Sequence, residues 1–206
     1  MPADEKLLIL LKAPLLGQVK TRMAAEIGAD NALAAYRQML DKVLSTMAPL
    51  SVVELHYTPK TELCLVKDIS NNRFTYHDQA EGDLGFRILA AFRQAFQAGA
   101  KRIAMIGTDC PEVTSLDVQT AWAALKTNDL VLGPAQDGGY WLIGLKEPHP
   151  ELFTGINWST ATVLTETLTR ASQLGLSHHL LQTLSDVDTL ADWQAYLARS
   201  QAQKLE

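Results

Sequence analysis

Cysteine is scarce in this chain, which contains only Cys64 and Cys110. The two lie in unrelated sequence contexts without metal-ligand spacing, so we expect two reduced thiols in a cytoplasmic protein. Long apolar runs are also missing, since no stretch approaches the ~20 residues that span a membrane. The N-terminal residues place acids before a short apolar run and lack a cleavage site, which argues against a secretory signal peptide.

Basic residues are in the minority. The chain has 18 Lys and Arg against 23 Asp and Glu, a net charge of −5, and no basic run that would suggest a nucleic-acid groove. An acidic protein that binds phosphates needs a metal ion or a local basic loop to offset repulsion. With 206 residues, 47% of them hydrophobic, the chain fits one α/β domain over residues 1–206.

Short apolar runs bounded by turn residues indicate the buried strands of a mostly parallel sheet. The clearest are Lys6–Lys12 and Arg102–Ile106, which we expect to be adjacent at its centre. Tyr140–Leu145 should pair antiparallel with Asp129–Leu132, because the turn between them is too short for a crossover. The other expected strands are Val52–Tyr57 near an edge, Arg73–His77, and one that begins at His178.

Amphipathic periodicity predicts the helices. Asp83 should N-cap the helix Leu84–Ala98 and pair with Arg87 one turn later, and Ser159 should N-cap a helix that runs to about Gly175. The other expected helices are Asp30–Met47, a short one within Lys60–Asn72, Ser115–Lys126, and a C-terminal helix that follows a capping box formed by Thr189 and Asp192.

Asp109 is the central candidate for function. It follows the buried strand Arg102–Ile106, and open α/β sheets bind their ligands at the carboxyl ends of such strands. A carboxylate in this place can hold a divalent metal against a phosphate. The alternative is that Asp109 only forms a turn and caps the helix Ser115–Lys126.

The loop after the first strand, residues 13–22, contains Gly17, Lys20 and Arg22. A strand, a loop of this kind and a helix form a natural phosphate cradle, because backbone N–H groups and cations converge on one anion. The glycine spacing does not match a Walker A loop. A solvated turn with incidental charges is the alternative.

Two further segments combine glycine and acid. Gly82 and Gly85 flank the cap at Asp83, and close approach of a ligand to the backbone would explain both glycines. Residues 133–139, with Asp137, Gly138 and Gly139, form a second turn after a buried strand. A tight hairpin would explain that turn alone, whereas two such turns together favour a shared cleft. Trp158 either lines that cleft or fastens a helix to the core.

Near the C-terminus, Asp186 and Asp188 are not needed for capping, and alternation turns both to the same side. If Asp109 and Asp188 reach the same edge of the sheet, their like charges repel unless a cation lies between them. This arrangement would favour a metal site.

Six segments, in this order, resemble a family of bacterial GT-A-fold (nucleotide-diphospho-sugar transferase) proteins, the DUF2064-type glycosyltransferases, related in fold to molybdenum-cofactor guanylyltransferase and phospholactate guanylyltransferase. The segments are KAPLLGQVKTR (12–22), GDLGFR (82–87), GTDCP (107–111), GPAQDGGYWLIGL (133–145), NWST (157–160) and DVDTLADW (186–193). The resemblance implies a three-layer α/β/α sandwich with a mostly parallel mixed sheet. It also implies a nucleotidyl- or glycosyltransferase that uses a nucleotide or nucleotide-diphospho-sugar donor and a small acceptor.

The resemblance implies roles for individual residues. Lys20 and Asp109 would be catalytic, with Mg²⁺ or Mn²⁺ held by Asp109 and by either Asp188 or Asp186. The expected nucleotide-binding residues are Lys12, Pro14, Gly17, Lys20, Thr21, Arg22, Gly82, Asp83, Gly85 and Thr108. The expected acceptor- or sugar-binding residues are Asp137, Gly138, Gly139, Tyr140 and Trp158. A nucleotide-binding module of the same fold without turnover is the alternative function, and a homodimer is left open.

Overall fold

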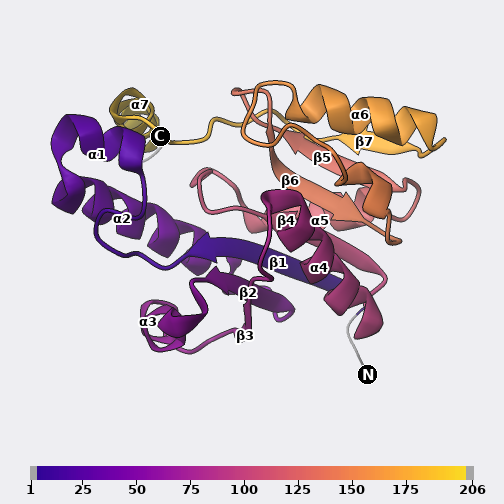
Figure 1. Cartoon of the computed structure of the whole chain (residues 1–206), viewed down its shortest axis with the longest axis horizontal. Coiled ribbons are helices and arrows are strands. Elements are labelled where there is room, and N and C mark those ends of the chain that lie inside the picture. The colour runs from indigo at the N-terminus through magenta and orange to yellow at the C-terminus, as the bar shows by residue number, and fades with distance from the viewer. Residues whose placement is uncertain (1–3, 203–206) are drawn as a thin grey trace.

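A computed structural model describes residues 4–202 of the chain. Its described strands form a seven-stranded sheet in the order β3-β2-β1-β4-β6-β5-β7 (Figure 1). The strands are β1 (Glu5–Lys12), β2 (Val53–Thr58), β3 (Thr75–Asp78), β4 (Arg102–Ile106), β5 (Leu130–Pro134), β6 (Tyr140–Leu145) and β7 (His178–Leu180). Only β6 runs antiparallel to its neighbours within this sheet. The predicted mostly parallel mixed sheet is therefore confirmed.

Helices cover both faces of the sheet, which makes three layers (Figure 1). They are α1 (Thr21–Ile27), α2 (Ala29–Met47), α3 (Leu63–Ile69), α4 (Leu84–Gln97), α5 (Ser115–Ala124), α6 (Val163–Gln173) and α7 (Leu190–Ala202), with short 3₁₀ turns at Lys60–Glu62 and Pro150–Leu152. Helices α4 and α6 pack on one face, and the others contribute to the core on the opposite face. No helix within residues 4–202 has the length and apolar character needed to cross a membrane.

The central position of β1 follows from its sequence. Leu7 and Ile9 face one apolar core while Leu8 faces the other, so the strand is buried on both sides. It pairs in parallel with β2 and with β4, with Leu8 opposite Met105. The predicted adjacency of the first strand and β4 is confirmed, as is the antiparallel pairing of β5 and β6.

The strand order also sets the place of the ligand site. From β1 the chain continues to β2 and β3 on one side, and β4 then pairs with the other side of β1. The strand order therefore reverses between β1 and β4, and a crevice is expected at the carboxyl ends of these two neighbouring strands. Open α/β sheets bind ligands at such a switch point.

Two local predictions were wrong. Helix α6 begins at Val163 and not at Ser159, which has a left-handed φ of 64°. Arg87 does not pair with Asp83; its Nε donates a 2.9 Å hydrogen bond to the Gly82 carbonyl. Strand β2 is the second strand from an edge of the sheet, beside β3, which accords with the prediction that it lies near an edge. Helix α1 was not predicted.

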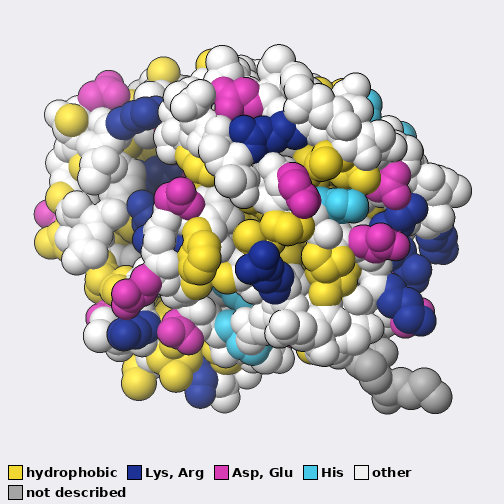
Figure 2. Space-filling view, turned by 45° about the vertical axis from the view of Figure 1, so that its right-hand side comes forward, with side chains coloured by type: hydrophobic (Ala, Val, Ile, Leu, Met, Phe, Trp, Pro, Cys, Tyr) yellow, Lys and Arg dark blue, Asp and Glu magenta, His cyan; other side chains and the backbone are white. Residues whose placement is uncertain are grey.

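On the face shown in Figure 2, basic side chains lie beside acidic ones and do not form an extended patch. Elsewhere in the described chain, Lys101 pairs with Asp4 at 3.0 Å and Lys146 with Asp129 at 2.9 Å. The mixed charge of this face accords with an acidic chain that has no long basic run.

Candidate functional site

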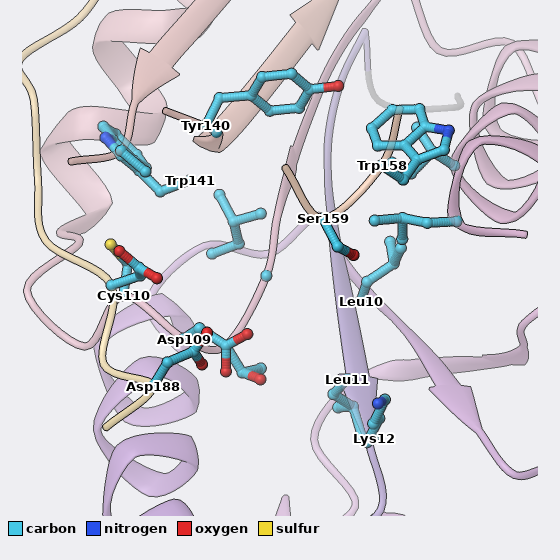
Figure 3. A pocket seen from close by; sticks show the side chains of 18 of the residues that line it. Leu10, Leu11, Lys12, Asp109, Cys110, Tyr140, Trp141, Trp158, Ser159 and Asp188 are labelled. Carbon is cyan, nitrogen blue, oxygen red and sulfur yellow. The ribbon is translucent and has the colours of Figure 1, made fainter. Parts of the chain in front are cut away.

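A cleft of about 760 Å³ opens above the carboxyl ends of β1 and β4 (Figure 3). Its walls come from segments that are far apart in the sequence: residues 10–12 and 19–22, residues 79–88, residues 105–110, residues 135–143, residues 158–163, and Asp186 and Asp188. The crevice predicted from the strand order is thus a real hollow in the surface.

Lys20 lies at the polar end of this cleft and joins its two key acids. Its Nζ donates hydrogen bonds to Asp109 Oδ1 at 2.6 Å, Asp188 Oδ1 at 2.8 Å and the Val187 carbonyl at 2.5 Å. The two carboxylates therefore share one cation, as the argument from like charges required. The cation in this structure is the ammonium group of Lys20.

The surroundings of Lys20 keep it charged. Its side chain is only 4% exposed. Burial by itself lowers the pKa of Lys20, but the adjacent Asp109 and Asp188 carboxylates outweigh burial, so the pKa lies above its ordinary value. The arrangement is a buried ammonium group with three oxygen acceptors.

Local backbone geometry brings Lys20 to this place. Lys20 precedes α1 with a left-handed φ of 47°, an uncommon conformation for a residue with a side chain. Its carbonyl accepts from Ala24 N at 2.8 Å, which starts the helix. The loop before it turns at Gly17, where φ is 73°. The short loop and the left-handed residue together direct the Lys20 side chain back over the end of the sheet.

The loop that carries Asp109 is bound to the segment that carries Asp188. The Val187 amide donates to the Asp109 carbonyl at 2.8 Å, and Cys110 Sγ donates to the Ser185 carbonyl at 3.1 Å. Burial raises the pKa of the Cys110 thiol, which keeps it neutral. These contacts fix the position of the Asp109 loop relative to the segment that carries Asp188.

A second link ties the same loop to the C-terminal helix. Arg199 on α7 forms two parallel hydrogen bonds of 2.9 Å with the Glu112 carboxylate. Bidentate Arg–carboxylate pairs of this kind constrain geometry more than a single contact does. Helix α7 therefore helps to position the Asp109 loop.

Neither acid is used as a helix cap. Helix α5 is capped by Thr114 and Asp117, which form a reciprocal capping box. At α7, Asp192 Oδ2 accepts from the Thr189 amide at 2.8 Å, and the predicted pairing of these two residues is confirmed. The alternative reading of Asp109 as a cap is thereby wrong.

The oxygen atoms around Lys20 suit a hard divalent cation. The side chains of Asp109 and Asp188 are 55% and 39% exposed, so each presents oxygen to the cleft as well as to Lys20. Mg²⁺ is commonly held by one or two carboxylates together with phosphate oxygens of a substrate. Within residues 4–202 no group of three or more His, Cys, Asp or Glu side chains is arranged to hold a metal by itself. These two acids would therefore hold a metal together with a bound phosphate.

The sequence of residues 42–160 matches the family described as "Uncharacterized protein conserved in bacteria (DUF2064)". The chain belongs to the DUF2064 family. A proposed nucleotide-diphospho-sugar transferase from Desulfovibrio desulfuricans G20 is 32% identical, and its crystal structure superposes with a TM-score of 0.86 over 91% of this chain and 83% of that one. The predicted resemblance and the predicted fold class are both confirmed.

More distant structures share the fold. CMP:2-keto-3-deoxy-manno-octonic acid synthetase, complexed with CTP, is 10% identical, with a TM-score of 0.61 over 98% of this chain and 100% of that one. Rv0371c from Mycobacterium tuberculosis H37Rv, complexed with manganese, is 10% identical, with a TM-score of 0.60 over 95% of this chain and 99% of that one. No curated protein matches the sequence.

In this DUF2064 chain, most of the predicted site residues meet in the cleft. The lining includes Lys12, Lys20, Thr21, Arg22, Gly82, Asp83, Thr108, Asp109, Asp137, Gly139, Tyr140, Trp158, Asp186 and Asp188. Pro14, Gly17, Gly85 and Gly138 are outside it. Asp83 also caps α4, accepting from the Phe86 amide at 2.8 Å, as predicted.

The structure gives two of the outlying glycines a packing role. A Cβ atom at Gly85 would lie 2.6 Å from Trp158 Nε1 and from the Phe153 carbonyl. A Cβ atom at Gly138, where φ is 88°, would lie 2.2 Å from the Ala161 carbonyl. Both glycines therefore let neighbouring chain segments approach closely, and at Gly85 the neighbour is the indole of Trp158.

Tyr36 is a site residue that the sequence reasoning missed. It lies on the apolar face of α2, where its ring is buried. Its hydroxyl donates to the Lys12 carbonyl at 2.8 Å and lies 3.3 Å from Thr108 Oγ1. It thus links the ends of β1 and β4 below the cleft. The only sequence signal was a tyrosine among aliphatic residues on a buried face.

Two further acids face the cleft without a cation. Asp186 is half-buried, and its pKa is raised to about 6 by burial and then by the charge of Asp137. Asp137 Oδ1 accepts from the Gly139 amide at 2.8 Å. Among residues 4–202 neither carboxylate makes an ion pair.

Proposed function

We propose that this chain is a metal-dependent transferase that uses a nucleotide or nucleotide-diphospho-sugar donor and passes a nucleotidyl or glycosyl group to a small acceptor. The observation that carries the proposal is the convergence of Asp109, Asp188 and the buried ammonium of Lys20 at the switch point of the sheet. A protein that binds a nucleotide without turnover has less need for two carboxylates and an ammonium group at one point of the cleft. The likeness to structures complexed with CTP and with manganese supports it.

The proposed roles follow from charge and position. Asp109 and Asp188 hold Mg²⁺ or Mn²⁺, which when bound supplies positive charge next to the donor phosphates. Lys12, Lys20 and Arg22 also line the cleft and contribute further positive charge. Positive groups placed in advance stabilise the negative charge that develops on a leaving phosphate.

The reaction requires no nucleophile from the protein. An oxygen atom of the acceptor forms the new bond, either to the anomeric carbon of a donor sugar or to the α-phosphorus of a donor nucleotide. The bond from that atom to the leaving phosphate breaks, and the nucleoside diphosphate or pyrophosphate departs with the electron pair. A proton from an acceptor hydroxyl passes to water. The chain acts by holding both reactants in place and offsetting charge.

A calorimetric panel tests the proposal. Nucleoside diphosphates, triphosphates and nucleotide-sugars are titrated into the chain with and without Mn²⁺, and products are analysed in parallel. We expect at least one nucleotide to bind more tightly with Mn²⁺, and Asp109→Asn to lose that metal dependence. Asp41→Asn, an exposed position on α2, is the matched control and should retain it. Metal-dependent binding without any product would favour the non-catalytic module, and no nucleotide binding would refute both functions.

A further inference from the structure

The positive side chains of the cleft all come from the first part of the chain. The basic residues in its lining are Lys12, Lys20, Arg22 and Arg87. The lining contributed by residues 107–188 contains no Lys or Arg. All the Lys and Arg side chains of the lining therefore come from residues 12–87.

Three of the basic residues in the lining already contact other groups of the chain. Lys20 is bound to Asp109 and Asp188, and Arg22 Nη1 lies 3.7 Å from Asp188 Oδ2. Arg87 Nε donates to the Gly82 carbonyl. All three, and Lys12 as well, belong to segments proposed to bind the donor nucleotide.

Two acids and an apolar wall make up much of the remaining lining of the cleft. Asp137 and Asp186 lie there without ion pairs among the described residues, and Asp186 is half-buried. The cleft lining that packs with the α4 and α6 core is apolar: Leu10, Ile88, Met105, Tyr140, Ile143 and Trp158. Figure 3 shows the rings of Tyr140 and Trp158 at the edge of the hollow, away from Asp109 and Asp188.

Trp158 is held firmly enough to act as a binding surface. Its indole lies against the backbone of Gly85 on α4, where any side chain would overlap Nε1. A fixed aromatic ring offers apolar area at little conformational cost and suits the apolar face of a sugar or a similar body.

From these observations we propose that the acceptor is an uncharged or cationic hydroxyl compound with an apolar face, and that phosphorylated acceptors are excluded. This inference rests on the proposed function. A phosphate monoester placed next to Asp137 and Asp186 would meet two carboxylates that no Lys or Arg of the described residues pairs with. A neutral or cationic molecule meets no such repulsion, and its hydroxyl oxygen can form the new bond while its proton passes to water.

Matched pairs of small molecules test the inference. Glucose with glucose 1-phosphate, glycerol with glycerol 3-phosphate, and choline with phosphocholine are titrated into the ¹⁵N-labelled chain. Each titration is made with Mg²⁺ and the tightest-binding nucleoside diphosphate of the panel above, and again without nucleotide. The indole signals of the four tryptophans are followed, and Trp158→Phe identifies the signal of Trp158.

We expect the unphosphorylated member of at least one pair to shift the Trp158 signal with an affinity at least tenfold higher than that of its phosphorylated partner. Asp137→Asn should reduce this ratio, whereas Asp41→Asn should leave it unchanged. Equal or tighter binding of the phosphorylated members would overturn the inference. A Trp158 signal that no compound shifts would overturn it as well. In either case nucleotide binding, measured in the same samples, reports separately on the proposed function.

Discussion

Replacing Lys20 with methionine should change metal binding and nucleotide binding in opposite directions. Methionine keeps most of the buried stem and removes the ammonium that joins Asp109 to Asp188. In the proposed site, Lys20 and a metal ion would compete for the same carboxylate oxygens in the free protein. With a nucleotide bound, the ammonium would contact its phosphates instead. Lys20→Met therefore tightens the binding of the metal alone and weakens that of the nucleotide.

The size of the effect follows from the geometry. Two oxygens that contact one nitrogen at 2.6 and 2.8 Å place the carboxylates about 5 Å apart. At an effective dielectric constant of about 20, like charges at that distance repel by about 3 kcal/mol. The carboxylates are 55% and 39% exposed, so screening leaves about 1–2 kcal/mol. Relief of this repulsion corresponds to roughly tenfold tighter Mn²⁺ binding. Loss of the phosphate contact costs about 1.5–3 kcal/mol.

Two titrations measure these changes. The free Mn²⁺ signal in electron paramagnetic resonance gives the dissociation constant of the metal alone, and calorimetry at matched ionic strength gives that of the nucleotide. Lys126→Met removes the same charge from an exposed position after α5 and should alter neither constant. Mn²⁺ binding that is unchanged or weaker in Lys20→Met would refute the competition.

Three further predictions concern the site and its support. Asp109→Asn should abolish metal-dependent nucleotide binding in calorimetry without raising the melting temperature, because Lys20 already offsets the repulsion. Gly85→Ala should destabilise the chain by about 1–3 kcal/mol in urea unfolding and shift the emission of Trp158, because the new methyl group overlaps the indole. Burial raises the pKa of Glu54, but the neighbouring His56 and Lys6 outweigh burial and hold the pKa at about 2. The contribution of Glu54 to the free energy of unfolding is therefore complete above about pH 4.5 and is lost as the pH falls toward 2. In unfolding titrations, the free energy of unfolding of Glu54→Gln should fall by on the order of 2–3 kcal/mol less than that of the wild-type chain over this pH range.

Each of these predictions has a contrary result. Retained metal dependence in Asp109→Asn would remove that residue from the metal site. Gly107→Ala is the control for Gly85→Ala, since a Cβ there meets nothing within 4 Å, and equal losses in the two variants would contradict the overlap. Identical acid unfolding of Glu54→Gln and the wild-type chain would mean that Glu54 has no depressed pKa.

The sheet could be predicted from sequence because its central strands are buried on both faces. Strands β1 and β4 read as apolar runs that end at turn residues, and the short turn before β6 left only an antiparallel pairing. The meeting of Asp109 and Asp188 at one edge followed from the same reasoning. Burial and strand direction, which are visible in the sequence, decided these features.

The rest depended on contacts between distant segments. Helix α1 buries only Met23 and has no apolar period to reveal it. The start of α6 is set by the Gly138 carbonyl, which accepts from the Leu164 amide at 3.0 Å, and not by a Ser159 side chain. The sequence also did not show that Lys20 lies between the two acids. A pattern of residue types does not tell whether a side-chain ammonium group or a metal ion offsets the charge of two neighbouring carboxylates.

The Lys20 bridge also has a consequence for the order in which the chain folds. The hydrogen bond from Lys20 to Asp188 joins residues 168 positions apart, and the bond to Asp109 joins residues 89 apart. Contacts of such separation close large loops, so they form only after local and sheet contacts have made most of the chain compact. A refolding chain should therefore regain its helical circular dichroism before it regains the proposed Mn²⁺ binding. A chain arrested at that stage would contain nearly all of its secondary structure and no site.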